Sequence, residues 1–160
     1  MTGDIPVPVS VSERVPVPAR PGEDPVALIR AAFAALNRRD LDACTRMMTE
    51  DFGINIAGMP FRMTGRAAWR RNVEVMRTAF PDFRVTVDDA FGTGDRVAVR
   101  VTIRGTHLGE FRGLPATGRR VEYSGIELYG VAGGLLTEEW IAPDTETLTA
   151  QLTGEAGAPG

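Results

Sequence analysis

The chain has 160 residues and contains no lysine, so all 18 of its basic residues are arginines. Without lysine it cannot form a Schiff base, hold pyridoxal phosphate covalently or build a phosphate loop ending in Gly-Lys-Ser/Thr. It also has only one histidine, His107, and one cysteine, Cys44. These counts exclude the usual zinc sites and any intrachain disulfide, although a metal site made of carboxylates alone stays open. We expect no cofactor, no metal, and a reducing cytoplasm as the compartment.

Excess positive charge and long apolar runs are also missing. The formal net charge is −3, and no Lys/Arg cluster marks a nucleic-acid or membrane surface. No apolar run approaches the roughly 20 residues that span a bilayer, and the first residues do not have the pattern of a secretion signal. With 43% apolar and 24% charged residues, the composition is that of an ordinary globular protein.

The N-terminal segment differs in composition from the rest. Residues 1–23 contain five of the eleven prolines, in a Val-Pro alternation that favours extended or polyproline-type backbone. We expect a flexible leader, with docking of its valines on a neighbouring subunit as the alternative. A single domain over residues 24–153 and a flexible tail over residues 154–160 complete the chain.

Helical spacing dominates the first half of the domain. Asp24 and Pro25 predict the start of a helix that ends near Asn37. Asp40 predicts the cap of a short second helix, which extends to Met47 and Met48. A strand ending at Gly58 follows, and then a third helix from a Thr64 cap to Pro81.

After Pro81 the pattern alternates as in strands. Apolar residues at 97, 99, 101 and 103 belong to a predicted hairpin, followed by a strand over about 119–131 and a last strand ending near Ile141. Arg100 and Arg104 lie on the other face of their strand, where they either bind an anion inside the cone or cover the other face of the sheet at a dimer contact. Asp144 predicts the cap of a terminal helix. The order of elements predicts an α+β fold with helices on one face of a curved antiparallel sheet.

One segment resembles a known family. The sequence GTHLGEFRGLPATGRR, residues 105–120, is similar to the loop of SnoaL-like polyketide cyclases, which belong to the nuclear transport factor 2-like superfamily. The resemblance extends over about residues 25–153. It implies a cystatin-like roll, a sheet wrapped on three helices into a cone with an internal pocket. It also implies a homodimer and a polyketide-like substrate of secondary metabolism, such as antibiotic biosynthesis.

The resemblance also implies positions for catalytic groups. A catalytic histidine of the aromatic polyketide cyclases corresponds to Glu127, and a catalytic aspartate corresponds to Ile141. An asparagine is retained as Asn72, and a tyrosine of some members corresponds to Leu36. These changes imply chemistry other than the aromatic aldol closure, such as ether-ring formation, dehydration or a pericyclic closure.

Two glutamates form the leading hypothesis for the site. A three-residue loop, Ala132-Gly133-Gly134, puts Glu127 opposite Glu139, whereas a two-residue loop puts Glu127 opposite Trp140. Neighbouring carboxylates resist joint ionisation, so such a pair supplies both an acid and a base. The alternative is that Glu139 is a solvated strand residue.

The other candidate catalytic residues have plainer alternatives. Asn72 lies within the apolar face of its helix, either to contact a ligand or as a satisfied core amide. Tyr129 shares strand parity with Glu127 and could hold an oxyanion. His107 is either a proton shuttle or a pin for the loop. Residues expected to line the substrate pocket are Trp69, Phe33, Leu36, Tyr123, Ile141, Trp140 and Met76.

Together these observations predict a cofactor-independent cyclase or isomerase that uses carboxylate acid/base catalysis in an apolar cone. Two alternatives stay open. One is an epoxide-opening hydrolase or ether cyclase on the same fold, and the other is a non-catalytic module for ligand binding or dimerisation.

Overall fold

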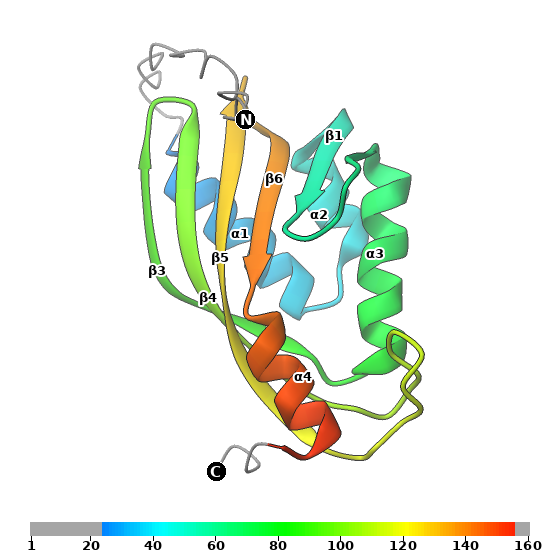
Figure 1. The fold of residues 1–160 in the computed structure, drawn as a ribbon. Helices are drawn as coiled ribbons and strands as arrows, with labels where there is room; N and C mark the ends of the chain where they lie inside the picture. Colours follow the sequence, from blue (N-terminus) through cyan, green and yellow to red (C-terminus); the bar gives the residue numbers. More distant parts are fainter. Residues whose placement is uncertain (1–23, 156–160) are drawn as a thin grey trace, which may run out of the picture.

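The computed structural model describes residues 24–155, so the predicted N-terminal leader and most of the predicted tail lie outside the described residues. A six-stranded sheet in the order β2-β1-β6-β5-β4-β3 carries α1 and α3 against one face, and α4 packs on β5 (Figure 1). The elements are α1 (Pro25–Asn37), α2 (Leu41–Arg46), β1 (Met48–Ile56), β2 (Met63–Thr64), α3 (Arg66–Ala79), β3 (Arg84–Thr93), β4 (Arg96–Thr106), β5 (Arg120–Ala132), β6 (Leu135–Pro143) and α4 (Thr145–Thr153).

Side-chain caps start three of the four helices. Asp24, Asp40 and Asp144 each accept a backbone N–H of the first turn of α1, α2 and α4, as the sequence predicts. The predicted Thr64 cap of α3 is wrong, because Thr64 belongs to β2 and Gly65, at φ 99°, takes the cap position. None of the helices within residues 24–155 is long and apolar enough to cross a membrane.

The α+β class and the helix-covered curved sheet are confirmed, but the sheet is mixed rather than antiparallel. Strand β1 runs parallel to β6, and the short β2, which the sequence pattern did not reveal, pairs with β1 at the edge. Strand β1 also begins earlier than predicted. Met48 pairs with Leu136, and the carbonyl of Met47 accepts the Leu136 N–H at 2.8 Å, so sheet pairing ends the predicted helix at this point.

The core lies between the helices and the inner face of the sheet. Alternate residues of β4, including Val97, Val99 and Val101, are buried there. The residues between them point outward, where Arg100 contacts Asp88 at 3.5 Å and Arg104 pairs with a carboxylate of β5 at 2.6 Å. These arginines therefore cover the outside of the fold and do not reach the interior.

Candidate active site

The turn between β5 and β6 has two residues. Gly133 and Gly134 have φ values of 56° and 74°, and Ala132 pairs with Leu135. Two consecutive positive φ values are typical of the type I′ turn, whose twist suits a tight hairpin. Of the two loops that the sequence allowed, the three-residue loop is therefore wrong and the two-residue loop is correct.

A β-bulge follows directly after this turn. Val131 pairs with Leu136, but the next pair is Gly130 with Glu138, so Thr137 is an extra residue on β6. An extra residue reverses the inward and outward alternation of the strand beyond it. Without the bulge, the alternation that buries Leu136 would turn position 139 outward.

The bulge decides which side chains of β6 reach the interior. Glu139 is 4% exposed and faces inward, whereas Trp140 is 52% exposed. Glu127 pairs with Ile141 and Glu139 pairs with Tyr129, so neither register expected from the sequence is correct. Both glutamates nevertheless lie on the inner face. Glu139 is paired with Tyr129, and Glu127 lies two residues from Tyr129 on β5, so all three side chains point to the same side of the sheet.

Gly130 provides the space that the bulge needs. A Cβ atom at this position would lie 2.6 Å from Oγ1 of Thr137 and 3.2 Å from Cγ of Glu138. Real Cβ atoms do not come as close as 2.6 Å to a neighbouring atom, so any other residue here requires the Thr137 side chain or the strand to shift. Gly130 therefore acts on the site indirectly, by allowing Glu139 to face inward.

Glu127, Glu139 and Tyr129 form a buried acidic group on the inner face. The Tyr129 hydroxyl donates to Oε2 of Glu127 at 2.5 Å, and Glu127 is 6% exposed. The ring of Phe33 from α1 packs edge-on against Tyr129, with centroids 6.2 Å apart. Within residues 24–155, neither glutamate forms an ion pair, in contrast to Glu138, which contacts two arginines.

Burial without a cation changes the titration of this group. Burial raises the pKa of Glu127 to about 7, although the hydrogen bond from Tyr129 opposes the change. Burial and the charge of Glu127 raise the pKa of Glu139 well above its ordinary value of 4.5. The pKa of Tyr129 is raised well above 10 by burial and by both carboxylates. At neutral pH, Glu127 is therefore divided between acid and base, and Glu139 keeps its proton to a higher pH than an exposed glutamate does.

The acidic group lies on the wall of an apolar cavity of about 460 Å³. Glu127, Glu139, Tyr129 and Asn72 all line it, so the structure brings together four of the five catalytic candidates. Within the described part of the chain, no three His, Cys, Asp or Glu side chains lie close enough to hold a metal ion. The apolar candidates that also line the cavity are Trp69, Phe33, Leu36, Tyr123, Ile141 and Met76.

Asn72 presents a free amide to this cavity. It lies on α3, is partly buried, and its side chain forms no hydrogen bond with any of residues 24–155. The interpretation as a satisfied core amide is therefore not supported. The side-chain amide is therefore available to donate a hydrogen bond to a bound molecule or to accept one from it.

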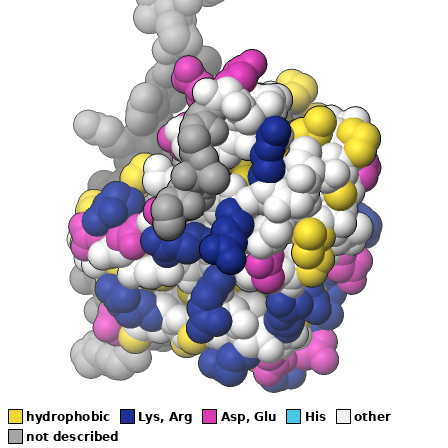
Figure 2. Space-filling view, turned by 90° about the horizontal axis from the view of Figure 1, so that it is seen from below, with side chains coloured by type: hydrophobic (Ala, Val, Ile, Leu, Met, Phe, Trp, Pro, Cys, Tyr) yellow, Lys and Arg dark blue, Asp and Glu magenta, His cyan; other side chains and the backbone are white. Residues whose placement is uncertain are grey.

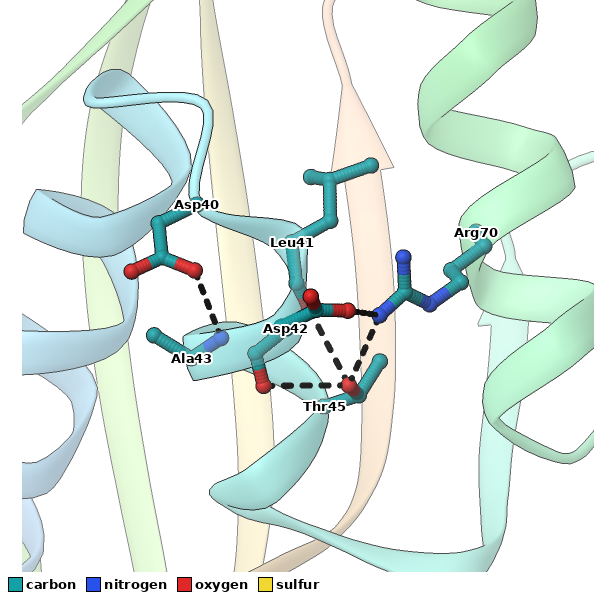
Figure 3. Close-up of polar contacts among 6 residues, drawn as sticks. All are labelled: Asp40, Leu41, Asp42, Ala43, Thr45 and Arg70. Carbon is teal, nitrogen blue, oxygen red and sulfur yellow. Dashed lines mark hydrogen bonds and ion pairs between the residues drawn. The ribbon is translucent and has the colours of Figure 1, made fainter.

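Polar contacts between α2 and α3 fix the wall from which Asn72 projects (Figure 3). The Arg70 guanidinium donates to the Asp42 carboxylate and, at 3.2 Å, to Oγ1 of Thr45. This link holds α2 beside α3, so Cys44 of α2 and Trp69 of α3 line the same cavity.

Two sequence candidates lie elsewhere. Trp140 lies on the outer face of the sheet, in an apolar groove with Ile126 and Leu128, because the bulge turns it outward. The homodimer implied by the resemblance stays a prediction, and this groove is an apolar surface available to it. His107 is fully buried against Phe80, with ring centroids 5.4 Å apart, and does not line the cavity.

The contacts of His107 indicate a structural role. Its Nδ1 lies 2.9 Å from Oγ1 of Thr117 and accepts the Thr117 N–H at 3.3 Å. Its backbone N–H and carbonyl bond to Arg119 and Gly118. His107 therefore holds the two ends of the loop together by hydrogen bonds. This structural role is the alternative to the proton shuttle in the sequence analysis.

Cys44 and Arg112 are two ionisable residues among the cavity-lining residues that the sequence analysis did not select. Cys44 lines the cavity, but burial raises the pKa of its thiol to about 11, so it is not a thiolate nucleophile at neutral pH. Arg112 lines the cavity from the loop between β4 and β5. It lies inside the family-like motif, and its left-handed backbone, at φ 51°, is visible only in the structure.

A curved sheet wrapped over helices around an apolar cavity is the architecture of nuclear transport factor 2-like proteins, and buried carboxylates on the cavity wall suit those members that are enzymes. The model of the SnoaL-like polyketide cyclase family matches residues 26–152. The chain belongs to this family. No curated protein matches the sequence.

Solved structures agree with this assignment. IdmH from Streptomyces antibioticus, a proposed polyketide cyclase, is 33% identical, with a TM-score of 0.72 over 81% of this chain and 99% of that one. AclR from Streptomyces galilaeus, a proposed hydroxylase, is 29% identical, with a TM-score of 0.72 over 83% of each chain. A SnoaL-like protein from Jannaschia sp. CCS1, at 21% identity and a TM-score of 0.77 over 84% of this chain and 96% of that one, shares the fold.

Proposed function

We propose that this protein is a cofactor-independent cyclase or isomerase that acts on a polyketide-like small molecule by proton transfer between carboxyl groups. The observation that carries the proposal is the Glu127, Tyr129 and Glu139 group on the wall of an apolar cavity. Membership of a polyketide cyclase family and the likeness to IdmH support the substrate class.

In this mechanism the two glutamates have different roles. The Glu127 carboxylate removes a proton from a carbon or hydroxyl group of the substrate, and the neutral Glu139 gives a proton to the oxygen on which charge develops. Asn72 orients the substrate, and the apolar wall excludes water from the reacting atoms. The substrate either forms a new bond that closes a ring or rearranges its existing bonds, and it gains or loses no protons overall.

The Tyr129 hydroxyl restores the resting state. After turnover Glu127 carries a proton and Glu139 is ionised. Tyr129 then accepts the proton of Glu127 while it donates its own to Glu139. This return is consistent with the position of the hydroxyl, which bonds to Glu127 and also influences the titration of Glu139.

Turnover of a substrate panel by matched glutamate variants tests the proposal. Polyketide-like lactones and polyenes are incubated with the wild-type protein, and products are identified by mass spectrometry. Glu127→Gln and Glu139→Gln should each lower the rate at least about 100-fold, since both remove a proton-transfer group while keeping the shape of the side chain. Glu138→Gln is the control, because this neighbouring glutamate does not line the cavity. Unchanged turnover in both cavity variants contradicts the proposal, whereas binding without any turnover by the wild type favours a non-catalytic ligand-binding module.

A hydrolase that opens an epoxide is the second candidate. The free Asn72 amide lies in the same cavity as an acid and a base and could hold a water molecule for attack on an epoxide. This reaction would give a diol with one oxygen from solvent. Turnover of an epoxide in ¹⁸O-labelled water separates it from a cyclase, whose product gains no solvent oxygen.

A further inference from the structure

Arg112 occupies an unusual place in the loop between β4 and β5. Phe111 and Leu114 form a small two-residue hairpin, in which the Phe111 N–H donates to the Leu114 carbonyl at 3.0 Å and the Leu114 N–H donates back at 2.9 Å. Arg112 and Gly113 form its centre, with φ values of 51° and 82°. The Glu110 carboxylate accepts the Gly113 N–H and fixes this turn.

A left-handed backbone is unfavourable for arginine. Glycine, asparagine and aspartate adopt it at the centre of such turns with less strain. Strained backbone of this kind is often found at functional sites. An arginine in such a turn at the rim of a cavity therefore indicates a functional role for its side chain.

The side chain of Arg112 packs against an aromatic ring, but no carboxylate among residues 24–155 balances its charge. Its guanidinium carbon lies 5.1 Å from the centroid of the Phe111 ring, which limits its orientations. Among the cavity-lining residues Arg112 is the one cation, and it forms no ion pair or hydrogen bond with any residue from 24 to 155. Arg112 is exposed to solvent, so it lies at the rim of the cavity and not in its interior.

We propose that Arg112 binds a carboxylate of the substrate at the mouth of the cavity and so selects anionic molecules over their neutral analogues. This inference rests on the proposed function, because it assigns a substrate feature to the same cavity. A planar guanidinium with free N–H groups matches a carboxylate, which it can bind through two parallel hydrogen bonds.

The strand geometry adds a requirement of length. Burial raises the pKa of Tyr123 to about 12, the charge of Arg112 opposes this change and the charge of Glu127 adds to it, so Tyr123 lies within the electrostatic influence of both groups. Tyr123 and Glu127 are four residues apart on β5, which corresponds to about 13 Å along a strand. A substrate with its carboxylate near Arg112 and its reacting atoms near the glutamates would therefore be elongated.

The charge distribution allows an anion to enter. Figure 2 shows arginine side chains, interspersed with acidic and hydrophobic ones, over the end of the molecule that is seen from below in Figure 1, the end to which the loop between β4 and β5 extends. Inside the cavity, the raised pKa values of Glu127 and Glu139 keep the negative charge small near neutral pH. An anionic group held at the rim thus meets a positive side chain and stays away from the carboxyl pair.

Binding of a matched pair of probes tests this proposal without turnover. Anthraquinone-2-carboxylate and anthraquinone-2-carboxamide have nearly the same shape and differ in charge, and isothermal titration calorimetry measures the affinity of each. The wild-type protein should prefer the carboxylate about tenfold, the effect of one charge-assisted hydrogen-bonded pair. Arg112→Gln should abolish the preference, and Arg84→Gln, which changes an exposed arginine outside the cavity, should keep it.

Two further variants distinguish failure of this inference from misfolding of the Arg112 variant and from failure of the catalytic proposal. Arg112→Gly removes the side chain at a backbone position that suits glycine, so it should fold at least as well as the wild type and still lose the preference. Glu127→Gln should keep the preference even where it abolishes turnover, so the catalytic proposal can fail independently. Equal affinity of the wild type for both probes, or a preference that persists in Arg112→Gln, overturns the inference.

Discussion

Replacing Glu127 with glutamine is expected to stabilise the folded protein at pH 8. Burial raises the pKa of Glu127 from 4.5 to about 7, so the folded state holds its proton over a range in which the unfolded chain has lost it. Glutamine is uncharged, has a similar shape and still accepts a hydrogen bond from Tyr129. It therefore removes the cost of ionising a buried carboxyl group without leaving a void.

The size and sign of the effect follow from proton linkage. Below pH 4.5 both states are protonated, and the wild type has its full stability. Between pH 4.5 and about 7 the unfolded chain ionises first, so the free energy of unfolding falls by about 1.4 kcal/mol per pH unit. Above about pH 7 the folded state ionises as well, and the loss levels off at about 3 kcal/mol. The variant should lack this loss.

Urea unfolding at several pH values from 4 to 9 measures the difference between wild type and variant. The difference should be small at pH 4 and reach about 3 kcal/mol in favour of Glu127→Gln at pH 8. Glu138→Gln is the matched control with the opposite sign. Its hydrogen bonds to Arg96 and Arg62 lower the pKa of Glu138, so its stabilisation is present above pH 4.5 and is lost as the pH falls through its folded pKa. Glu138→Gln should therefore be less stable than the wild type at pH 8.

A pH-independent difference between wild type and Glu127→Gln would refute the assignment of a raised pKa. So would a variant that is less stable than the wild type at pH 8, because Glu127 would then be a stabilising anion. Any pH dependence that Glu127→Gln retains in this range, relative to Glu127→Gln/Glu139→Gln, reports the titration of Glu139.

Two other outcomes can be checked directly. Gly130→Ala should destabilise the protein by about 1–3 kcal/mol in urea unfolding, because the new Cβ would lie 2.6 Å from Oγ1 of Thr137, and Thr137→Ala in the same chain should restore part of the loss; a harmless Gly130→Ala would show that the bulge does not need glycine. Cys44 is buried and its pKa is raised to about 11, so a thiol reagent at pH 8 should label it slowly in the folded protein and fast in urea. Equal labelling rates would place the thiol in contact with solvent.

Local sequence determined much of the framework. The capping aspartates, the helical spacing of α1 and the alternation in β4 all act within a few residues, so their effects can be read without knowing the fold. The motif at residues 105–120 and the order of elements also predicted the family, which the match over residues 26–152 confirms. That Glu127 and Glu139 both point inward was expected, though for the wrong register.

Contacts between distant segments decided the rest. The parallel pairing of β1 with β6 joins residues more than 80 positions apart, and no local pattern specifies it. The bulge at Thr137 depends on the space left by Gly130 of the neighbouring strand, and this one extra residue turns Glu139 inward and Trp140 outward. His107 is buried away from the cavity because the loop closes on it from both ends. The sequence determined which chemical groups the chain carries, while strand register and loop closure, which depend on long-range packing, decided which of them meet in the cavity.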